Sequence, residues 1–223
     1  PFHPLRPFRP DPTDAACRAG ELATCRRLDD AFAHVDLFLN EAAAHPRDVE
    51  WDNDFAANRA NEVDPRFGGR VVGLVTEGTL GGDVSREAVF FQVARIRLFD
   101  MPVAVFTGDD DCRGAQGLCN RRGLYPEVVS LDLGPPVDPE PRSADCVAGS
   151  PANCVWSRRY ERGTSVVNVT DEPRTVRVEL GVEGCRRVTD LYAGADLEGG
   201  ACVDEVTLDL PPWSGRLLRV EPA

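Results

Sequence analysis

Three short apolar runs in the first half of the chain are separated by stretches with helical character. The runs are "HVDLFLNE" (34–41), "RVVGLVTEG" (70–78) and "MPVAVFTGDDD" (101–111). Apolar runs of about six residues are typical of strands that are buried on both faces of a parallel sheet. A β-α-β-α-β order predicts parallel strands joined by right-handed crossovers. This pattern constrains the fold most strongly, and it predicts an α/β arrangement.

Two helices are expected between these strands. The stretch "WDNDFAANRANEV" (51–63) has acidic residues in its first turn and stops before Pro65. The stretch "SREAVFFQVARIRLF" (85–99) has helical periodicity and ends at Met101 and Pro102. Its apolar stripe consists of Val89, Val93 and Ile96, joined by Phe90, Ala94 and Leu98.

The character of the sequence changes after Asp111. Residues 112–153 are rich in Pro, Gly, Asp and Cys, and they are expected to form loops. From residue 154 onward, alternating runs between turn residues predict a small antiparallel β-sandwich. The expected strands are "VWSRRYE", "TSVVNVT", "TVRVEL", "RRVTDLY", "EVTLDL" and "GRLLRVE". The predicted organisation is a β-α barrel portion (1–111), a Cys-rich loop insert (112–153) and a C-terminal β-sandwich (154–223).

The number of β-α units has a consequence for the fold. Three units are too few for a closed (β/α)8 barrel, which takes about 250 residues. Three parallel strands alone would also leave a bare sheet edge. We therefore expect further strands upstream of Pro1 in a longer protein. The predicted fold class is α/β followed by all-β, with the last β-α units of an incomplete TIM-type barrel preceding the sandwich.

The eight cysteines fall into four close pairs along the sequence. The pairs are Cys17/Cys25, Cys112/Cys119, Cys146/Cys154 and Cys185/Cys202. An even count with local spacing indicates disulfide bonds, and hence a secreted or extracytoplasmic protein, although connectivity does not follow from sequence. Zinc is the alternative, but no C-x-x-C spacing occurs and the three His are scattered.

The charge of the chain excludes some partner classes. The net charge is −12, which disfavours nucleic acid and anionic membranes because both require a basic face. No run approaches the roughly 18 apolar residues of a membrane-spanning helix, so we expect no membrane insertion. All 25 basic residues are Arg, which indicates a GC-rich, bacterial coding sequence. The sequon "NVT" (168–170) therefore carries little weight as a glycosylation site.

Two stretches of the second half carry a family resemblance. They are "RRYERGTSVVNVTDEPRTVRVEL" and "VTLDLPPWSGRLLRV". The positions Arg159 to Pro173 and Leu210 to Leu218 resemble the C-terminal β-domain of glycoside-hydrolase-like proteins. The resemblance implies that the β-α half is the last part of a barrel of that kind. It also implies a carbohydrate-active protein that hydrolyses O-glycosidic bonds.

An acidic residue follows each of the three expected strands, and in barrels of this type the carboxyl ends of the strands build the active site. Glycoside cleavage needs two carboxyl groups, one protonated and one ionised. We predict Glu41 and Glu77 as this catalytic pair. Strand alternation places Glu41 on the face of Val35, Leu37 and Leu39, and it places Glu77 on the face of Val71, Gly73 and Val75.

Four residues near the same strand ends are predicted to contact the sugar: Asn40, Trp51, Asp109 and Asp110. A Trp face stacks on pyranose rings, and Trp51 follows Glu41 on its loop. Two alternatives stay open for the run Asp109–Asp111, which are a solvated loop and a calcium site, although the spacing matches no EF-hand. No cofactor and no metal ligands are otherwise predicted.

Rival interpretations of function also follow from the sequence. Nucleophile elbows, zinc-protease motifs and Walker loops are absent. The second hypothesis is a non-catalytic protein that binds carbohydrate or a partner on the same scaffold, and the third is a structural fragment without activity. A separation beyond about 10 Å between the carboxyl groups of Glu41 and Glu77 would disfavour hydrolysis by this pair.

Overall fold

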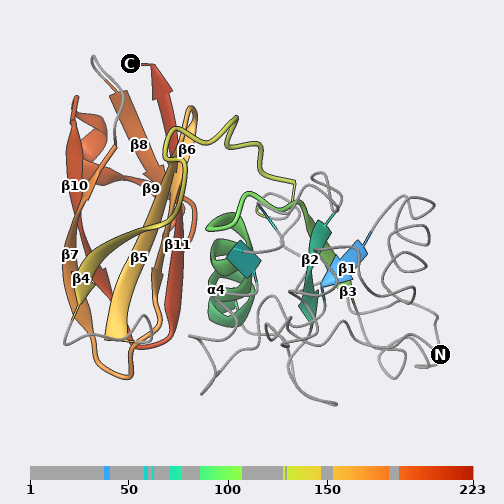
Figure 1. Cartoon of the computed structure of the whole chain (residues 1–223). Coiled ribbons are helices and arrows are strands. Elements are labelled where there is room, and N and C mark those ends of the chain that lie inside the picture. The colour runs from blue at the N-terminus through green and yellow to red at the C-terminus, as the bar shows by residue number, and fades with distance from the viewer. Residues whose placement is uncertain are drawn as a thin grey trace, which may run out of the picture.

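A computed structural model describes residues 38–40, 58, 59, 62, 71–76, 86–106, 128, 130–146, 153–180 and 186–222, and the structural statements that follow concern these residues. They form a parallel sheet, the helix α4 and two antiparallel sheets. Figure 1 shows these elements as successive layers, with α4 between the parallel sheet and the antiparallel sheets.

The parallel sheet contains three strands in the order β1 (Phe38–Asn40), β2 (Val71–Thr76) and β3 (Val103–Phe106). Both pairings are parallel. The helix α4 (Arg86–Arg97) lies between β2 and β3 in the chain. The predicted order of these elements and their parallel pairing are therefore confirmed. Residues 58, 59 and 62 are helical, and the rest of the helix expected at 51–63 lies outside the described residues.

Helix α4 is buried on every side, which corrects the prediction of one apolar stripe. Its residues from Val89 to Ile96 are each at most 1% exposed. On one side Ile96 packs against Gly73 of β2, and on the other Ala94 packs against Gly215 of the antiparallel layer. A helix between two sheets buries both of its faces, so Phe91, outside the predicted stripe, is buried as well.

The close approach of α4 to the antiparallel layer depends on Gly215. A Cβ atom at this position would lie 2.7 Å from the carbonyl oxygen of Phe90 and 2.8 Å from the Cα of Phe91. Gly215→Ala is therefore expected to lower the free energy of unfolding by about 1–3 kcal/mol, because backbone atoms have to move apart. Urea denaturation measures this change. An unfolding free energy within about 0.5 kcal/mol of the wild type would contradict this packing.

The larger antiparallel sheet has six strands, and the smaller has two. The larger sheet has the order β4 (Arg142–Cys146), β5 (Cys154–Tyr160), β6 (Gly163–Asn168), β11 (Ser214–Pro222), β8 (Arg186–Asp190) and β9 (Ala195–Asp196). The smaller pairs β10 (Glu205–Leu210) with β7 (Arg174–Glu179), and a short 3-10 helix, η3 (Leu197–Gly200), follows β9.

The six strands predicted after residue 154 are all present, and two further strands accompany them. The strand β9 has two residues and pairs with β8. The strand β4 pairs with β5, with a register shift between Ser143 and Asp145, in a range where loops were expected. The sequence of β4, "RSADC", has no apolar alternation, so pattern analysis does not find it. Edge strands are commonly polar because they pair on one side only.

The two antiparallel sheets enclose one apolar core, and the larger sheet faces a second one. Val166 and Leu218 of the larger sheet pack with Val178 and Leu208 of the smaller. Adjacent residues of β6 and β11, such as Leu217, belong instead to the core around α4. Because successive side chains alternate between faces, β6 and β11 contribute to both cores. This explains why all six residues of β6 are buried.

One predicted cysteine pair is confirmed as a disulfide. Cys146 and Cys154 are bonded and join β4 directly to β5. Cys202 is also disulfide-bonded. The pairs Cys17/Cys25 and Cys112/Cys119 lie outside the described residues.

The described part of the chain contains no helix with the length and apolar character needed to span a membrane.

Candidate functional site

The carboxyl ends of β1, β2 and β3 lie at one edge of the parallel sheet, because the three strands run in the same direction. The last residues of these strands are Asn40, Thr76 and Phe106. Asn40, a predicted sugar contact, is thus placed at this edge by its backbone. The other predicted site residues lie outside the described residues: Glu41, Glu77, Trp51, Asp109 and Asp110.

The register of the sheet shows which positions share a face. Gly73 faces α4, because a Cβ atom there would lie 2.5 Å from Ile96 Cγ2. Asn40 pairs with Gly73, and Gly73 pairs with Val103, which packs against the core around α4. Paired positions of a parallel sheet lie on the same face, and successive positions alternate. The position of Asn40 therefore belongs to the α4 face, and that of Leu39 belongs to the opposite face.

The register bears on the faces to which alternation assigns the two predicted catalytic residues, which themselves lie outside the described residues. Glu41 was assigned by alternation to the face of Leu39, which is the face away from α4. Glu77 was assigned to the face of Gly73, which lies against α4. Strand alternation therefore assigns the two predicted residues to opposite faces of the sheet.

The register relates the three strands where they are described. Asn40 lies level with Gly73, and Thr76 lies level with Phe106.

Three side chains of β5 and β6 donate hydrogen bonds to backbone carbonyls at the carboxyl end of α4. This end of the helix lies on the side of the sheet opposite to the carboxyl ends of the strands. Ser165 Oγ donates to the carbonyl of Ala94 (2.7 Å), and Arg158 donates to that of Leu98 (2.9 Å). Tyr160 donates its hydroxyl to the carbonyl of Arg97. Burial raises the pKa of Tyr160, so the phenol keeps this proton. A cation at a helix carboxyl end is also favoured by the helix dipole.

Arg158 connects several segments from a position that is only 2% exposed. Besides Leu98, it binds Glu62 Oε1 at 2.5 Å and the carbonyl of Asp138 at 3.2 Å. Glu62 is also bound by Arg59 at 2.7 Å. A buried guanidinium requires such partners, because each unpaired N–H would lose its bond to water. This cluster therefore fixes the sandwich to the β-α half of the chain.

Asp138 is fully buried beside this cluster. Arg159 binds its carboxylate through Nη2 (2.7 Å) and Nε, and Arg142 binds it at 2.6 Å. Burial by itself raises the pKa of Asp138, but the hydrogen bonds and charge of Arg159, with the charge of Arg142, outweigh burial and lower it. Asp138 is accordingly a structural carboxylate that stays ionised.

Asn168, within the stretch 159–173, is buried and connects two turns. Its Nδ2 donates to the carbonyls of Glu172 (2.8 Å) and Pro211 (2.9 Å), and to that of Leu210 at 3.2 Å. Its Oδ1 accepts from the backbone and the hydroxyl of Thr170. Because Asn168 is 0% exposed in the folded protein, its amide is inaccessible to glycosylation.

Asn168→Asp is expected to lower the free energy of unfolding by about 2–3 kcal/mol at pH 7, because a carboxylate cannot donate to the three carbonyls. These carbonyl oxygens raise the pKa of the new carboxyl in the folded state. The loss of unfolding free energy should therefore be smallest below about pH 4 and grow as the pH rises. Urea denaturation at pH 4 and at pH 7 measures this difference. Asn153→Asp, at an exposed position, is the control. Equal losses at pH 4 and pH 7 would contradict the proposed contacts.

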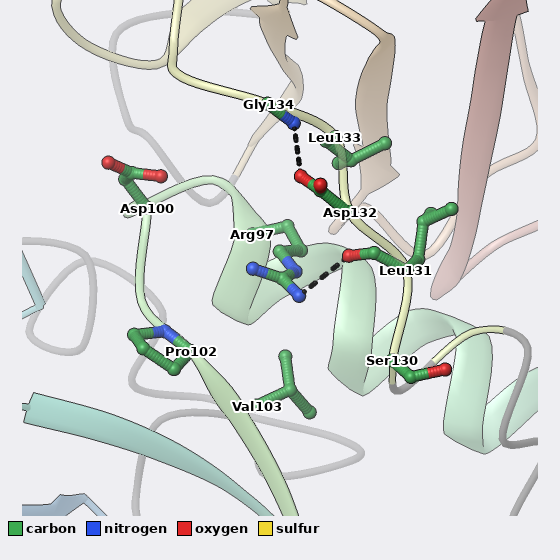
Figure 2. Close-up of a pocket in the computed structure, with 9 residues that line it drawn as sticks. All are labelled: Arg97, Asp100, Pro102, Val103, Ser130, Leu131, Asp132, Leu133 and Gly134. Carbon is green, nitrogen blue, oxygen red and sulfur yellow. Dashed lines mark hydrogen bonds between the residues drawn. The ribbon is translucent and has the colours of Figure 1, made fainter.

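A pocket of about 430 Å³ lies at the amino end of β3, between the turn that follows α4 (residues 97–103) and the segment 130–134. Figure 2 shows Arg97 donating to the carbonyl of Leu131 (3.0 Å), and Gly134 donating to Asp132 (2.8 Å). The hydrogen bond from Gly134 and one from Arg162 lower the pKa of Asp132. The pocket is at the opposite edge of the sheet from the strand ends that were predicted to carry the chemistry.

One feature of the sequence indicates the buried cluster around Arg158. In "VWSRRY", alternation places Arg158 between Trp156 and Tyr160 on one face of the strand, and both aromatic residues pack at the core around α4. A charge on an apolar face indicates a buried partner. Within the described residues, no group of three or more His, Cys, Asp or Glu is arranged to hold a metal ion, and Asp109–Asp111 lies outside them.

No protein-family model matches this sequence. No curated protein shows significant similarity to it either. Solved structures are nevertheless similar in fold. The GH27 β-L-arabinopyranosidase of Geobacillus stearothermophilus has a TM-score of 0.55 at 14% identity, over 86% of this chain and 46% of that one. A variant of that enzyme in complex with arabinose has a TM-score of 0.53 at 16% identity, over the same shares.

α-Galactosidase I from Mortierella vinacea has a TM-score of 0.52 at 12% identity, over 86% of this chain and 55% of that one. This chain therefore spans about half the length of these enzymes. At such low identity the similarity concerns the fold alone.

Proposed function

We propose that the protein hydrolyses O-glycosidic bonds, and that this chain supplies the last β-α units of a TIM-type barrel together with its C-terminal β-sandwich. The observation that carries the proposal is the parallel sheet β1-β2-β3, whose carboxyl ends meet at one edge and are followed in the sequence by acidic residues. The fold similarity to two glycosidases supports it.

Glu41 is the principal catalytic carboxylate in this proposal. It follows Asn40 directly, and the register of β1 against β2 supports a position on the face away from α4. That face is the interior of a barrel, because helices cover the exterior.

Glu77 is the proposed second carboxylate, with Trp51, Asp109 and Asp110 as sugar contacts. Asn40, whose position belongs to the α4 face, contacts the sugar in this proposal only if the end of the strand twists out of phase. For the pair to act, its carboxyl groups have to lie about 5–5.5 Å apart in a retaining enzyme, or about 6.5–9.5 Å in an inverting one. Glu77 reaches this range only if the chain leaves regular strand geometry after Thr76, where β2 ends. Gly78 follows directly and permits such a bend.

The names of the similar enzymes suggest the substrates for a first experiment. We expect the full-length protein to hydrolyse a nitrophenyl α-D-galactopyranoside or β-L-arabinopyranoside, with release of nitrophenol as the measurement. The β-D-galactopyranoside and α-L-arabinopyranoside of opposite anomeric configuration are matched controls. Absence of turnover on all four glycosides and on a panel of natural oligosaccharides would contradict a hydrolase.

A second function, non-catalytic carbohydrate binding, is favoured by one observation. The Gly73 face, to which alternation assigns Glu77, lies against α4, so a regular strand would leave Glu41 without Glu77 as its partner carboxylate. One carboxylate does not support the two-carboxylate mechanism. Calorimetric binding of the same sugars without turnover would identify this alternative.

We also propose that the protein is secreted or extracytoplasmic. The disulfide Cys146–Cys154 and the disulfide-bonded Cys202 support this location, because such bonds persist in oxidising compartments.

A further inference from the structure

The amino end of α4 lies on the same side of the molecule as the carboxyl edge of the parallel sheet. Helix α4 follows β2 and precedes β3, and these strands are parallel, so the helix has to run back between them. Its first turn, at Arg86 and Glu87, is therefore on the side of the proposed active site. Its last turn, at Arg97, is on the side of the pocket in Figure 2.

The sandwich reaches this first turn through the turn between β8 and β9. Arg86 donates to the carbonyl of Leu191 at 2.9 Å, and the Tyr192 hydroxyl donates to Glu87 Oε1 at 2.5 Å. The ring of Tyr192 packs edge-on against Phe90, with 5.3 Å between the ring centroids. We call Arg86, Glu87 and Tyr192 the turn clamp.

The turn that carries Tyr192 is itself held in one conformation. Asp190 Oδ1 accepts from the backbone N–H of Tyr192 at 2.8 Å, and Gly194 donates to the Asp190 carbonyl at 2.8 Å with a φ of 67°. The Arg216 guanidinium lies 4.1 Å from the centre of the Tyr192 ring and pairs with Asp190 at 3.4 Å. Tyr192 is thus presented to α4 by a preorganised support.

We propose that the turn clamp positions the first turn of α4 at the carboxyl edge and so sets the geometry of the carbohydrate site, an inference that rests on the proposed function. Tyr192 and Glu87 are then positioning residues that act through α4. The hydrogen bond between them is exposed, so it contributes little to global stability. A purely structural clamp would leave catalysis unchanged, and this difference makes the proposal testable.

The test compares Tyr192→Phe, Glu87→Ala and the double variant in the full-length protein. Tyr192→Phe removes the hydroxyl and keeps the ring that packs on Phe90. We expect kcat to fall about threefold to tenfold with KM within about twofold, as loss of one net hydrogen bond allows. Amide exchange in residues 86–90 should become faster. The double variant should lose no more than the more affected single variant, because the bond that Tyr192→Phe removes is already absent in Glu87→Ala.

The control is Thr175→Val, which removes a comparable exposed bond from a hydroxyl to the carboxylate of Asp209 (2.6 Å) in the β7–β10 pair. It should leave kcat unchanged. The clamp inference alone is overturned if the wild type turns over glycosides and Tyr192→Phe keeps full kcat, or if the two single losses multiply in the double variant. A wild type that neither hydrolyses nor binds any glycoside refutes the proposed function, and the clamp inference fails with it.

Discussion

Replacing Glu41 by Gln in the full-length protein is expected to lower kcat for glycoside hydrolysis at least about 10³-fold while Tm stays nearly unchanged. The amide has almost the same size as the carboxyl group, but it neither carries a charge nor transfers a proton. Because the proposed function assigns Glu41 to the barrel interior, the substitution should remove chemistry rather than packing. Steady-state kinetics and a thermal melt measure the two effects.

Comparison with two other variants sharpens this experiment. Glu198→Gln, at an exposed position in η3, should retain full activity. Glu77→Gln tests the second proposed carboxylate and should also reduce kcat if the pair acts together. Full turnover by Glu41→Gln would remove Glu41 from the mechanism. Loss of activity in Glu77→Gln alone would show that the chain beyond Thr76 departs from strand alternation and that Glu77 carries the chemistry.

Arg158→Met should lower the free energy of unfolding by about 3–5 kcal/mol, the usual cost of removing one partner from a buried ion pair. The side chain of Met fills similar space but leaves Glu62 without its bond at 2.5 Å, and it leaves the carbonyls of Leu98 and Asp138 without that donor. Urea denaturation followed by far-ultraviolet circular dichroism measures the change.

Arg187→Met is the matched control for Arg158→Met. The Arg187 side chain is 54% exposed and lies 3.9 Å from Asp196, so its removal should cost less than about 1 kcal/mol. If Arg158→Met also cost less than about 1 kcal/mol, the buried cluster would not hold the two halves of the protein together, and apolar packing on α4 would be sufficient.

Much of the fold follows from local sequence pattern. The strands β2 and β3 and the helix between them were predicted because apolar runs alternate with helical periodicity. The later strands were predicted because turn residues separate alternating segments. The strand β4 was missed because an edge strand needs few apolar residues. The burial of α4 on both sides was missed because it depends on β6 and β11, which follow much later in the chain.

Less of the candidate site was predictable. A sequence shows that an acidic residue follows a strand. Which face of the sheet that residue lies on depends on the pairing register of the strands and on which face of the sheet a helix covers. That information assigned Asn40 to the α4 face and weakened the alternation argument for Glu77. The roles of Arg158 and Asn168 were equally hidden, because their partners are backbone carbonyls of distant segments whose positions no side-chain pattern encodes.

The position of α4 between two sheets has a consequence for how proteins of this architecture diversify. One side of the helix packs on Gly73, and the other packs on Gly215. A different β-module in place of the sandwich would have to offer α4 an equally close packing surface, because this side of the helix is otherwise exposed to water. A substitution in α4 therefore has to satisfy the packing of two sheets at once.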